Sequence, residues 1–226
     1  MAQQTQIARV DEAWAAFMER YPAPRSLAQA PTSDVLRAWA GLGYNRRAVH
    51  LQRAAVAIEA DHGGRVPGEL DALEALPGVG PYTARAVAAI AYGRAVAAVD
   101  TNVRRVVARV TAAELSPREL QAEADAWVDP ADPAGWTHAS MELGAVVCVA
   151  RRPRCPVCPV ARWCASAGQV QPAPQGPGAH SPQASAARSP QAPFEHTTRW
   201  LRGRIVERLR ELDDGAWTRL PSTIGR

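Results

Sequence analysis

The sequence contains no lysine, and all 26 of its basic residues are arginines. Because no lysine amine is available to form a Schiff base, this class of covalent catalysis is excluded. Long hydrophobic runs are missing too, since the longest apolar region, Val87–Tyr92, is far too short to cross a bilayer. No basic start followed by an apolar run predicts a signal peptide. We therefore expect a cytoplasmic protein with reduced thiols.

A strong excess of one charge sign is also lacking, because the formal net charge is only +4. Any affinity for nucleic acid must then come from local patches of arginine, which binds phosphate with two parallel hydrogen bonds. Alanine is abundant throughout the chain, so compositional drift explains the preference for arginine equally well.

Cysteine occurs four times, and the four residues form one motif, C-x6-C-x2-C-x5-C. They are Cys148, Cys155, Cys158 and Cys164. Four thiolates suit either zinc or an iron–sulfur cluster. Zinc ribbons bring two close pairs together across a longer loop, whereas only Cys155 and Cys158 form such a pair here. The spacing favours a [4Fe–4S] cluster over zinc, and both over disulfides.

Apolar residues recur with a helical period from Ile7 to about Ser166, and no alternating strand pattern interrupts them, so we expect an all-α body. Thr32 or Ser33 and the pair Ser116-Pro117 are typical helix starts, and glycines such as Gly63 and Gly93 are typical stops. The expected helices are Ala8–Tyr21, Thr32–Leu42, Arg46–Asp61, Pro67–Ala75, Tyr82–Tyr92, Thr101–Val110, Pro117–Val128 and Trp136–Cys148.

The composition changes after this body. Residues 167–194 are rich in Pro, Ala, Ser and Gln and have almost no large apolar side chains, which predicts a disordered linker. Residues 195–226 contain one basic amphipathic helix, expected at Thr197–Leu212. This is too little for an independent domain, so we interpret it as an incomplete helical tail.

The segment Leu76–Gly80 joins two of the expected helices. Gly78 and Gly80 let the backbone turn tightly and present successive N–H groups at a helix N-terminus, where an anion is favoured. This is the helix-hairpin-helix arrangement that grips a DNA backbone phosphate without reading sequence. An ordinary helix–helix turn is the alternative, but the apolar residues on both flanks favour DNA.

Asp100 stands twenty residues beyond Gly80, before the helix expected from Thr101. Its position suits an N-cap. A capping carboxylate at the edge of a cleft also remains an acceptor there, so a structural and a chemical role are compatible.

Together these motifs resemble the helix-hairpin-helix base-excision DNA glycosylases, and among them the MutY-type adenine DNA glycosylases. The resemblance covers residues 3 to about 166. It implies a domain at 1–166 that includes an iron–sulfur loop at 148–164. The strings that carry it are Gln3–Gln6, Gly41–Tyr44, Leu76–Ala84, Val99–Arg109 and Met141–Gly144.

The resemblance also implies a reaction class. Bifunctional relatives of the endonuclease III type carry a Lys where this chain has Tyr82, and that Lys cleaves the strand. Because this chain has no Lys, we expect a monofunctional glycosylase that uses water. The absence of Lys argues against the third possibility, a glycosylase/lyase.

By the same resemblance, Asp100 stabilises positive charge developing on the sugar, and Tyr82 and Asn102 line the pocket of a flipped adenine. Gln3, Gln4 and Tyr44 match positions that probe the opposing 8-oxoguanine, although interhelical packing is an alternative for Tyr44. The implied partner is double-stranded DNA containing A:8-oxoguanine or A:G mispairs, bound by a monomer associated with a bacterial nucleoid.

The chain departs from the family pattern at its start. The general acid of the family is a Glu two residues upstream of the position of Met1, so we expect the chain as written to be impaired. Glu12 and Glu142 match no motif and do not replace it. A non-catalytic helix-hairpin-helix DNA-binding protein is therefore the second hypothesis. No part of this sequence resembles the Nudix-like domain that many adenine glycosylases carry.

The cysteine motif is surrounded by positive charge. Because hydrolysis needs no electron, we expect a cluster there to be structural. The neighbouring arginines form a patch for phosphates or, alternatively, solvated surface charge; they are Arg151, Arg152, Arg154 and Arg162.

Overall fold

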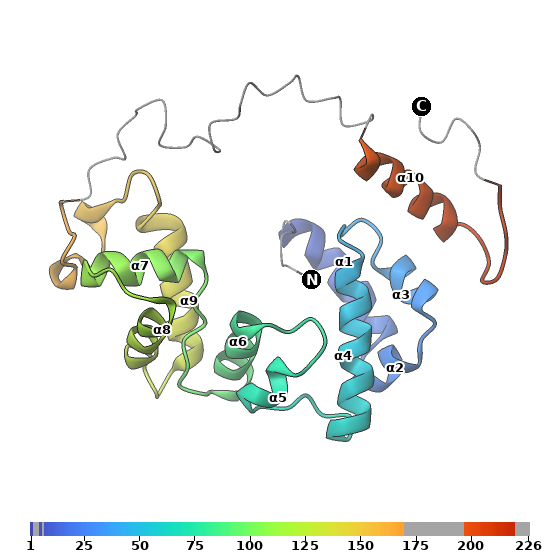
Figure 1. Cartoon of the computed structure of the whole chain (residues 1–226), viewed down its shortest axis with the longest axis horizontal. Helices are drawn as coiled ribbons and strands as arrows, with labels where there is room; N and C mark the ends of the chain where they lie inside the picture. Colours follow the sequence, from blue (N-terminus) through green and yellow to red (C-terminus); the bar gives the residue numbers. More distant parts are fainter. Residues whose placement is uncertain (2–4, 6, 170–196, 220–226) are drawn as a thin grey trace. The chain divides into compact units, whose positions relative to one another are not determined.

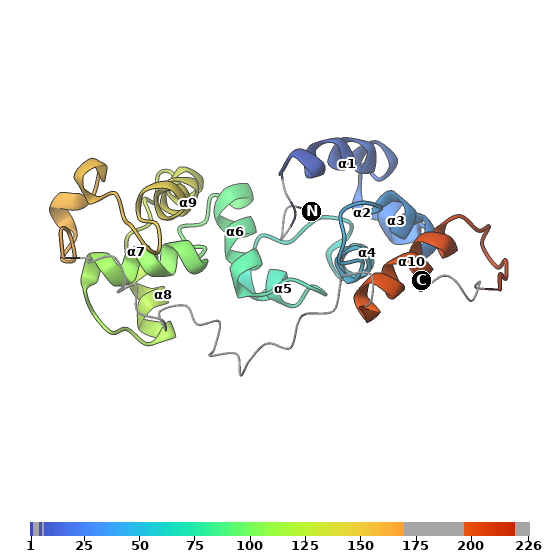
Figure 2. The same ribbon diagram turned by 90° about the horizontal axis from the view of Figure 1, so that it is seen from above.

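The computed structural model describes residues 1, 5, 7–169 and 197–219, and every regular element in these ranges is a helix (Figures 1 and 2). The predicted all-α class is thereby confirmed. The chain separates into two compact units, Met1–Arg65 with Ala184–Arg226, and Val66–Gln183. Most of the predicted linker, 167–194, lies outside the described residues. Within the described ranges, no helix has both the length and the apolar character needed to cross a membrane.

The first unit has an aromatic core. Phe17 lies 4.9 Å from the Tyr21 ring and meets Trp39 edge-on at 5.9 Å between ring centres. All three rings are buried, and the buried side chains of Leu27 and Val35 belong to the same hydrophobic core. The helices that contribute to this core are α1 (Ile7–Arg20), α2 (Pro24–Gln29), α3 (Thr32–Ala38) and α4 (Arg46–His62), and the same unit also contains α10 (Thr198–Arg210).

The start of α3 differs from the sequence prediction. Neither Thr32 nor Ser33 caps the helix, because the N-cap is Pro31 and no side chain bonds there. The Thr32 hydroxyl instead donates to the buried amide oxygen of Gln52 at 2.9 Å, and the Ser33 hydroxyl donates to Asp214 at 2.8 Å. Both hydroxyls therefore bond to residues distant in the sequence, so neither caps α3.

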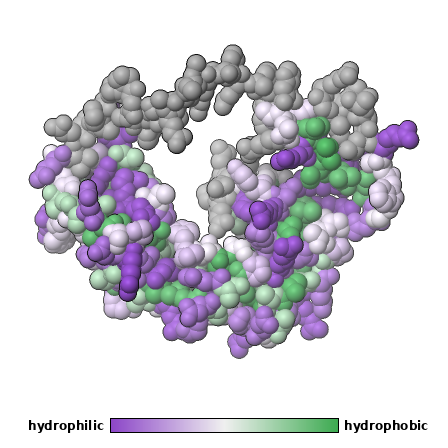
Figure 3. All heavy atoms as spheres, in the orientation of Figure 1, coloured by the Kyte–Doolittle hydropathy of each residue, from purple (hydrophilic) through white to green (hydrophobic). Residues whose placement is uncertain are grey.

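The helix α10 packs against α3. Arg37 donates to the carbonyl oxygens of Arg210 at 3.1 Å and Leu212 at 2.6 Å, so its guanidinium satisfies the C-terminal end of α10. Asp214 accepts from both Arg37, at 3.0 Å, and Ser33. In Figure 3 the hydrophobic residues of α10 are visible as a green group at the upper right.

The second unit is a succession of short helices. The helix α6 packs on both α5 and α9, and its buried residues are three alanines, whose small side chains permit close approach. The core between α7 and α8 contains Val103, Val107 and Leu120. The elements are α5 (Leu70–Glu74), α6 (Pro81–Tyr92), α7 (Thr101–Thr111), α8 (Pro117–Ala126), α9 (Pro133–Glu142), a π-helical turn η1 (Leu143–Val147) and two 3₁₀ turns, η2 (Cys155–Val157) and η3 (Ala161–Trp163).

Local signals predicted most helix ends correctly. Ser116 forms a capping box with Glu119 at the start of α8, and Gly63 and Gly93 end α4 and α6 in the left-handed conformation. The prediction for Trp136–Cys148 was wrong at both ends, because Asp132 caps α9 and the helix widens into η1 after Glu142. The predicted helix at Pro67–Ala75 is shorter in the structure, and α2 was not predicted.

Candidate functional site

Asp100 forms the N-cap of α7, as its position predicted. Its Oδ1 accepts from the backbone N–H groups of Asn102 at 2.8 Å and Val103 at 2.7 Å. Its Oδ2 accepts from the side-chain amide of Asn102 at 3.0 Å. The residue is only partly buried. Oδ1 therefore caps the helix, while Oδ2 accepts from Asn102, which the sequence analysis placed in the same site.

Tyr82 lies at the start of α6 and remains 39% exposed. Its hydroxyl donates to the sulfur of Met141 in α9, at 3.7 Å. Burial and, secondly, the negative charge of Asp100 raise the pKa of Tyr82. The hydroxyl therefore stays protonated at neutral pH, and in the structure it donates to Met141. The structure thus brings Tyr82, Asp100 and Asn102 together in one unit.

The turn Leu76–Gly80 connects α5 with α6. Leu76 is buried and anchors the turn, and its carbonyl accepts from Val79 N–H at 3.0 Å. Gly78 has a φ of 83°, which residues with a Cβ rarely adopt. Gly80 is the N-cap of α6 and has no capping side chain. Both glycines are exposed, so the turn at the N-terminus of α6 lies at the surface.

Arg105, one turn into α7, connects this site to the cysteine loop. Its guanidinium donates to the side-chain oxygen of Asn102 at 2.9 Å. It also donates to the carbonyls of Gly144 at 2.5 Å and Cys148 at 2.8 Å. A Cβ on Gly144 would lie only 2.6 Å from Cβ of Asn102. The segment before the cysteines therefore lies directly against the start of α7.

The four predicted metal ligands are brought together. Their side chains line one cavity with apolar residues of α7 and η1; the four are Cys148, Cys155, Cys158 and Cys164. All four are free, so none forms a disulfide. Arg109 donates to the sulfur of Cys148 at 3.3 Å, and its backbone oxygen accepts from Cys164 at 3.4 Å. Within the described ranges, no group of three His, Cys, Asp or Glu forms a ready site for a single metal ion.

This cavity fits a thiolate-bound group by the chemistry of its donors. Sulfur is the ligand atom of iron–sulfur clusters, and Val106, Val110 and Leu143 supply an apolar wall that would shield such a group from water. Arg109 adds a positive charge beside one sulfur and also holds the loop through the carbonyls of Val149 and Ala150.

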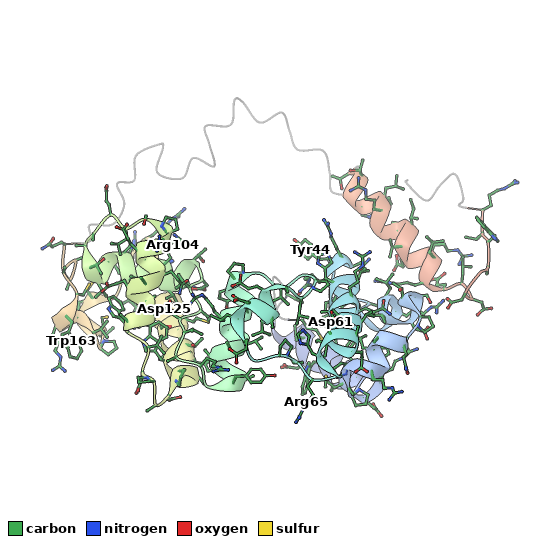
Figure 4. The ribbon with its side chains drawn as sticks, turned by 60° about the horizontal axis from the view of Figure 1, so that its bottom comes forward. Tyr44, Asp61, Arg65, Arg104, Asp125 and Trp163 are labelled. Atoms are coloured by element: carbon green, nitrogen blue, oxygen red, sulfur yellow. The ribbon has the colours of Figure 1, made fainter. Side chains whose placement is uncertain are left out.

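The arginines around the cysteines are exposed, as are several large side chains of the loop. Arg162 stacks on the ring of Trp163 at 3.7 Å, and Trp163 is itself 61% exposed. Figure 4 labels Trp163 in this loop and Arg104 on α7. The exposed arginines of the loop are Arg151, Arg152, Arg154 and Arg162.

Tyr44 belongs to the other unit and precedes α4 (Figure 4). Its side chain is 52% exposed and its φ is 48°, so it projects from a tight loop instead of filling the core. This geometry opposes the alternative of interhelical packing. Gln3 and Gln4 lie outside the described residues.

The sequence did not identify Arg105, Arg109 or Gly144 as functional positions. Their partners are backbone carbonyls and a Cβ position some forty residues away. The available signals were the strings Val99–Arg109 and Met141–Gly144, which contain all three positions, and the spacing of the two arginines, which places them on one face of α7.

Comparison with known proteins matches residues 1–130 to the family described as HhH-GPD superfamily base excision DNA repair protein. The chain is 45% identical to the adenine DNA glycosylase of Mycobacterium tuberculosis, over 93% of this chain and 67% of that protein. It is 41% identical to the human adenine DNA glycosylase, over 76% of this chain and 33% of that protein.

Solved structures share the fold. A thermostable thymine-DNA glycosylase aligns with a TM-score of 0.69 and 28% identity, over 74% of this chain and 80% of that one. A non-covalent endonuclease III–DNA complex aligns with a TM-score of 0.64 and 27% identity, over the same shares of the two chains.

Proposed function

We propose that this chain hydrolyses the N-glycosidic bond of adenine mispaired with 8-oxoguanine or guanine. The chain belongs to the HhH-GPD superfamily of base excision DNA repair proteins and, within it, to the branch of the adenine DNA glycosylases. The family resemblance expected from the sequence is confirmed. One observation supports the site most directly: the side-chain amide of Asn102 donates to the Asp100 carboxylate at the start of α7, and the charge of that carboxylate helps to raise the pKa of Tyr82.

The chemistry follows from this arrangement. Excision requires the adenine to leave the base stack, at a cost of roughly a few kcal/mol. As the bond between sugar and base breaks, positive charge develops on the sugar, and the carboxylate of Asp100 stabilises it. Asn102 holds that carboxylate through one oxygen. Tyr82 contributes a protonated hydroxyl at the same site. Water then attacks the sugar, because no lysine is present to do so.

DNA binding uses contacts that read no sequence. The backbone N–H groups of the turn that contains the exposed Gly78 and Gly80 receive a backbone phosphate at the N-terminus of α6. Tyr44, with Gln3 and Gln4, probes the base opposite the adenine. The exposed arginines of the cysteine loop add phosphate contacts. The protein acts as a monomer, associated with the bacterial nucleoid.

A [4Fe–4S] cluster is the group that the four cysteines would hold. It would supply a rigid centre for the loop, not an electron for the reaction. Arg105 and Arg109 donate to backbone carbonyls of this loop, so α7 carries both Asp100 and the anchors of the cysteine segment. Iron and acid-labile sulfide, measured on the purified chain with zinc as the alternative, test this assignment.

The activity test uses three duplexes that differ only opposite the target adenine: 8-oxoguanine, guanine or thymine. Excess protein is incubated with each, and samples are analysed with and without hot alkali. Because the resemblance places a Glu two residues before Met1, the chain is compared with a form extended to carry it. We expect alkali-dependent cleavage of the two mispaired duplexes, about 10²–10⁴-fold slower without the Glu.

Two variants make the test specific to the site. Asp100→Asn removes the negative charge but keeps an acceptor for α7, whereas Asp61→Asn removes an exposed carboxylate of α4. Base removal is expected to slow, by about 10²–10³-fold, only in the first. Binding without base removal by the extended form would favour the non-catalytic hypothesis, and cleavage without alkali would contradict a monofunctional reaction.

A further inference from the structure

The loop before α4 is held in an unusual backbone conformation. Gly41 and Gly43 have φ values of 82° and 69°, and Tyr44 continues the left-handed series at 48°. Glycine adopts these angles freely, but a residue with a Cβ does so only when its surroundings compensate. The exposed ring of Tyr44 is therefore presented by a conformation that some other group must stabilise.

Arg47 is that group. Its guanidinium donates to the carbonyls of Leu42 at 2.9 Å and Gly43 at 3.3 Å. It also lies 5.6 Å from the centre of the Tyr44 ring and 5.5 Å from that of Trp39, within the range of cation–π contacts. The buried Trp39 donates to the same Gly43 carbonyl at 3.1 Å. The Arg47 side chain thus contacts both the backbone of this loop and the ring of Tyr44.

The same guanidinium reaches the N-terminal segment. It donates to the Met1 carbonyl at 2.8 Å and to the Thr5 hydroxyl at 2.8 Å. The Thr5 hydroxyl in turn donates to the Leu42 carbonyl at 3.1 Å. Arg47 therefore fastens the chain on both sides of the stretch 2–4 to the loop that presents Tyr44.

We propose that Arg47 is a positioning residue for recognition of the base opposite the excised adenine. It touches no base itself but sets the backbone conformation in which the Tyr44 ring meets DNA. The inference rests on the proposed function. If only a fraction of molecules holds the loop correctly, the apparent dissociation constant for the lesion rises by the inverse of that fraction. Binding to undamaged DNA, which depends on phosphate contacts, does not.

The test measures a discrimination ratio, defined as the dissociation constant for an A:T duplex divided by that for the A:8-oxoguanine duplex. We expect Arg47→Gln to lower this ratio about tenfold, the effect of a loop that is correct in about one molecule in ten. Arg53→Gln is the matched control, since it removes an exposed arginine from the same helix. It is expected to leave the ratio unchanged.

A double-mutant cycle separates positioning from general stability. Tyr44→Ala is expected to lower the ratio, and adding Arg47→Gln to it is expected to lower the ratio no further. A residue that merely stabilised the unit would lower it again. Arg47→Lys keeps the charge but not the planar fork, so it is expected to give an intermediate ratio even if Arg47→Gln folds poorly.

Each outcome decides the question. A wild-type chain that binds both duplexes equally overturns the proposed recognition of the mispair and this inference with it. A wild-type chain that discriminates, with Arg47→Gln matching Arg53→Gln, overturns this inference alone. Additive losses for Tyr44→Ala and Arg47→Gln also contradict it.

Discussion

Replacing Gly144 with Ala introduces a methyl group where the structure has no space. A Cβ at Gly144 would lie 2.6 Å from Cβ, 3.0 Å from the carbonyl carbon and 3.1 Å from Cα of Asn102. Carbon atoms in contact are normally about 3.5–4.0 Å apart. Because two of these atoms belong to the backbone of α7, no side-chain rotation relieves the overlap. The turn η1 and the start of α7 must separate by roughly 1 Å.

The size of the effect follows from this overlap. Overpacking of a filled contact costs about 1–3 kcal/mol of unfolding free energy. For a chain of this length each kcal/mol lowers the thermal midpoint by about 2–4 °C. The separation also draws the Gly144 carbonyl away from Arg105, which holds Asn102 as well. A misplacement of this size at a reacting centre costs about 10²-fold in rate.

Thermal unfolding followed by circular dichroism measures the first effect, and the alkali assay on the extended chain measures the second. Gly203→Ala is the matched control, because a Cβ there meets no atom within 4 Å. Gly203 lies inside α10, where Ala is favoured over Gly by about 1 kcal/mol. The reasoning is refuted if Gly144→Ala keeps the wild-type midpoint and rate, or if both variants lose stability equally.

Three further results are expected. Asp100→Asn should keep its stability but lose about 10²–10³-fold in base removal, whereas Asp100→Ala should also lose about 0.5–2 kcal/mol in urea unfolding, because the cap of α7 is gone. Iron held in the proposed cluster should be released to a chelator faster from Arg109→Leu than from Arg104→Leu, since Arg109 donates to a cysteine sulfur and Arg104 is exposed on the same helix. Hydrogen bonds from a serine hydroxyl and an arginine of α3 lower the pKa of Asp214 below its usual 3.8. The stability that this lowered pKa contributes is present above pH 3.8 and is lost as the pH falls through the lowered value. The protection factors of the α10 amides, which correct for the slower intrinsic exchange at low pH, should therefore fall there in the wild-type chain but not in Asp214→Asn.

The helices themselves could be predicted from local sequence. Ser116 with Glu119, Gly63 and Gly93 specify helix ends through bonds and backbone angles within a few residues. Some failures were local, since the cap of α9 by Asp132 was missed, and others arose where a distant group competed for a local one. Thr32 is the clearest case, because its hydroxyl is taken by Gln52, twenty residues away.

The candidate site divides in the same way. Asp100 as a cap, the glycine turn and the four cysteines were evident in the sequence, since each depends on residue types at short fixed spacings. The lack of lysine alone excluded a Schiff-base reaction. Arg47, Arg105 and Arg109 were not distinguishable from the other arginines, because an arginine acquires a role only through the carbonyls and rings that the tertiary structure brings to it.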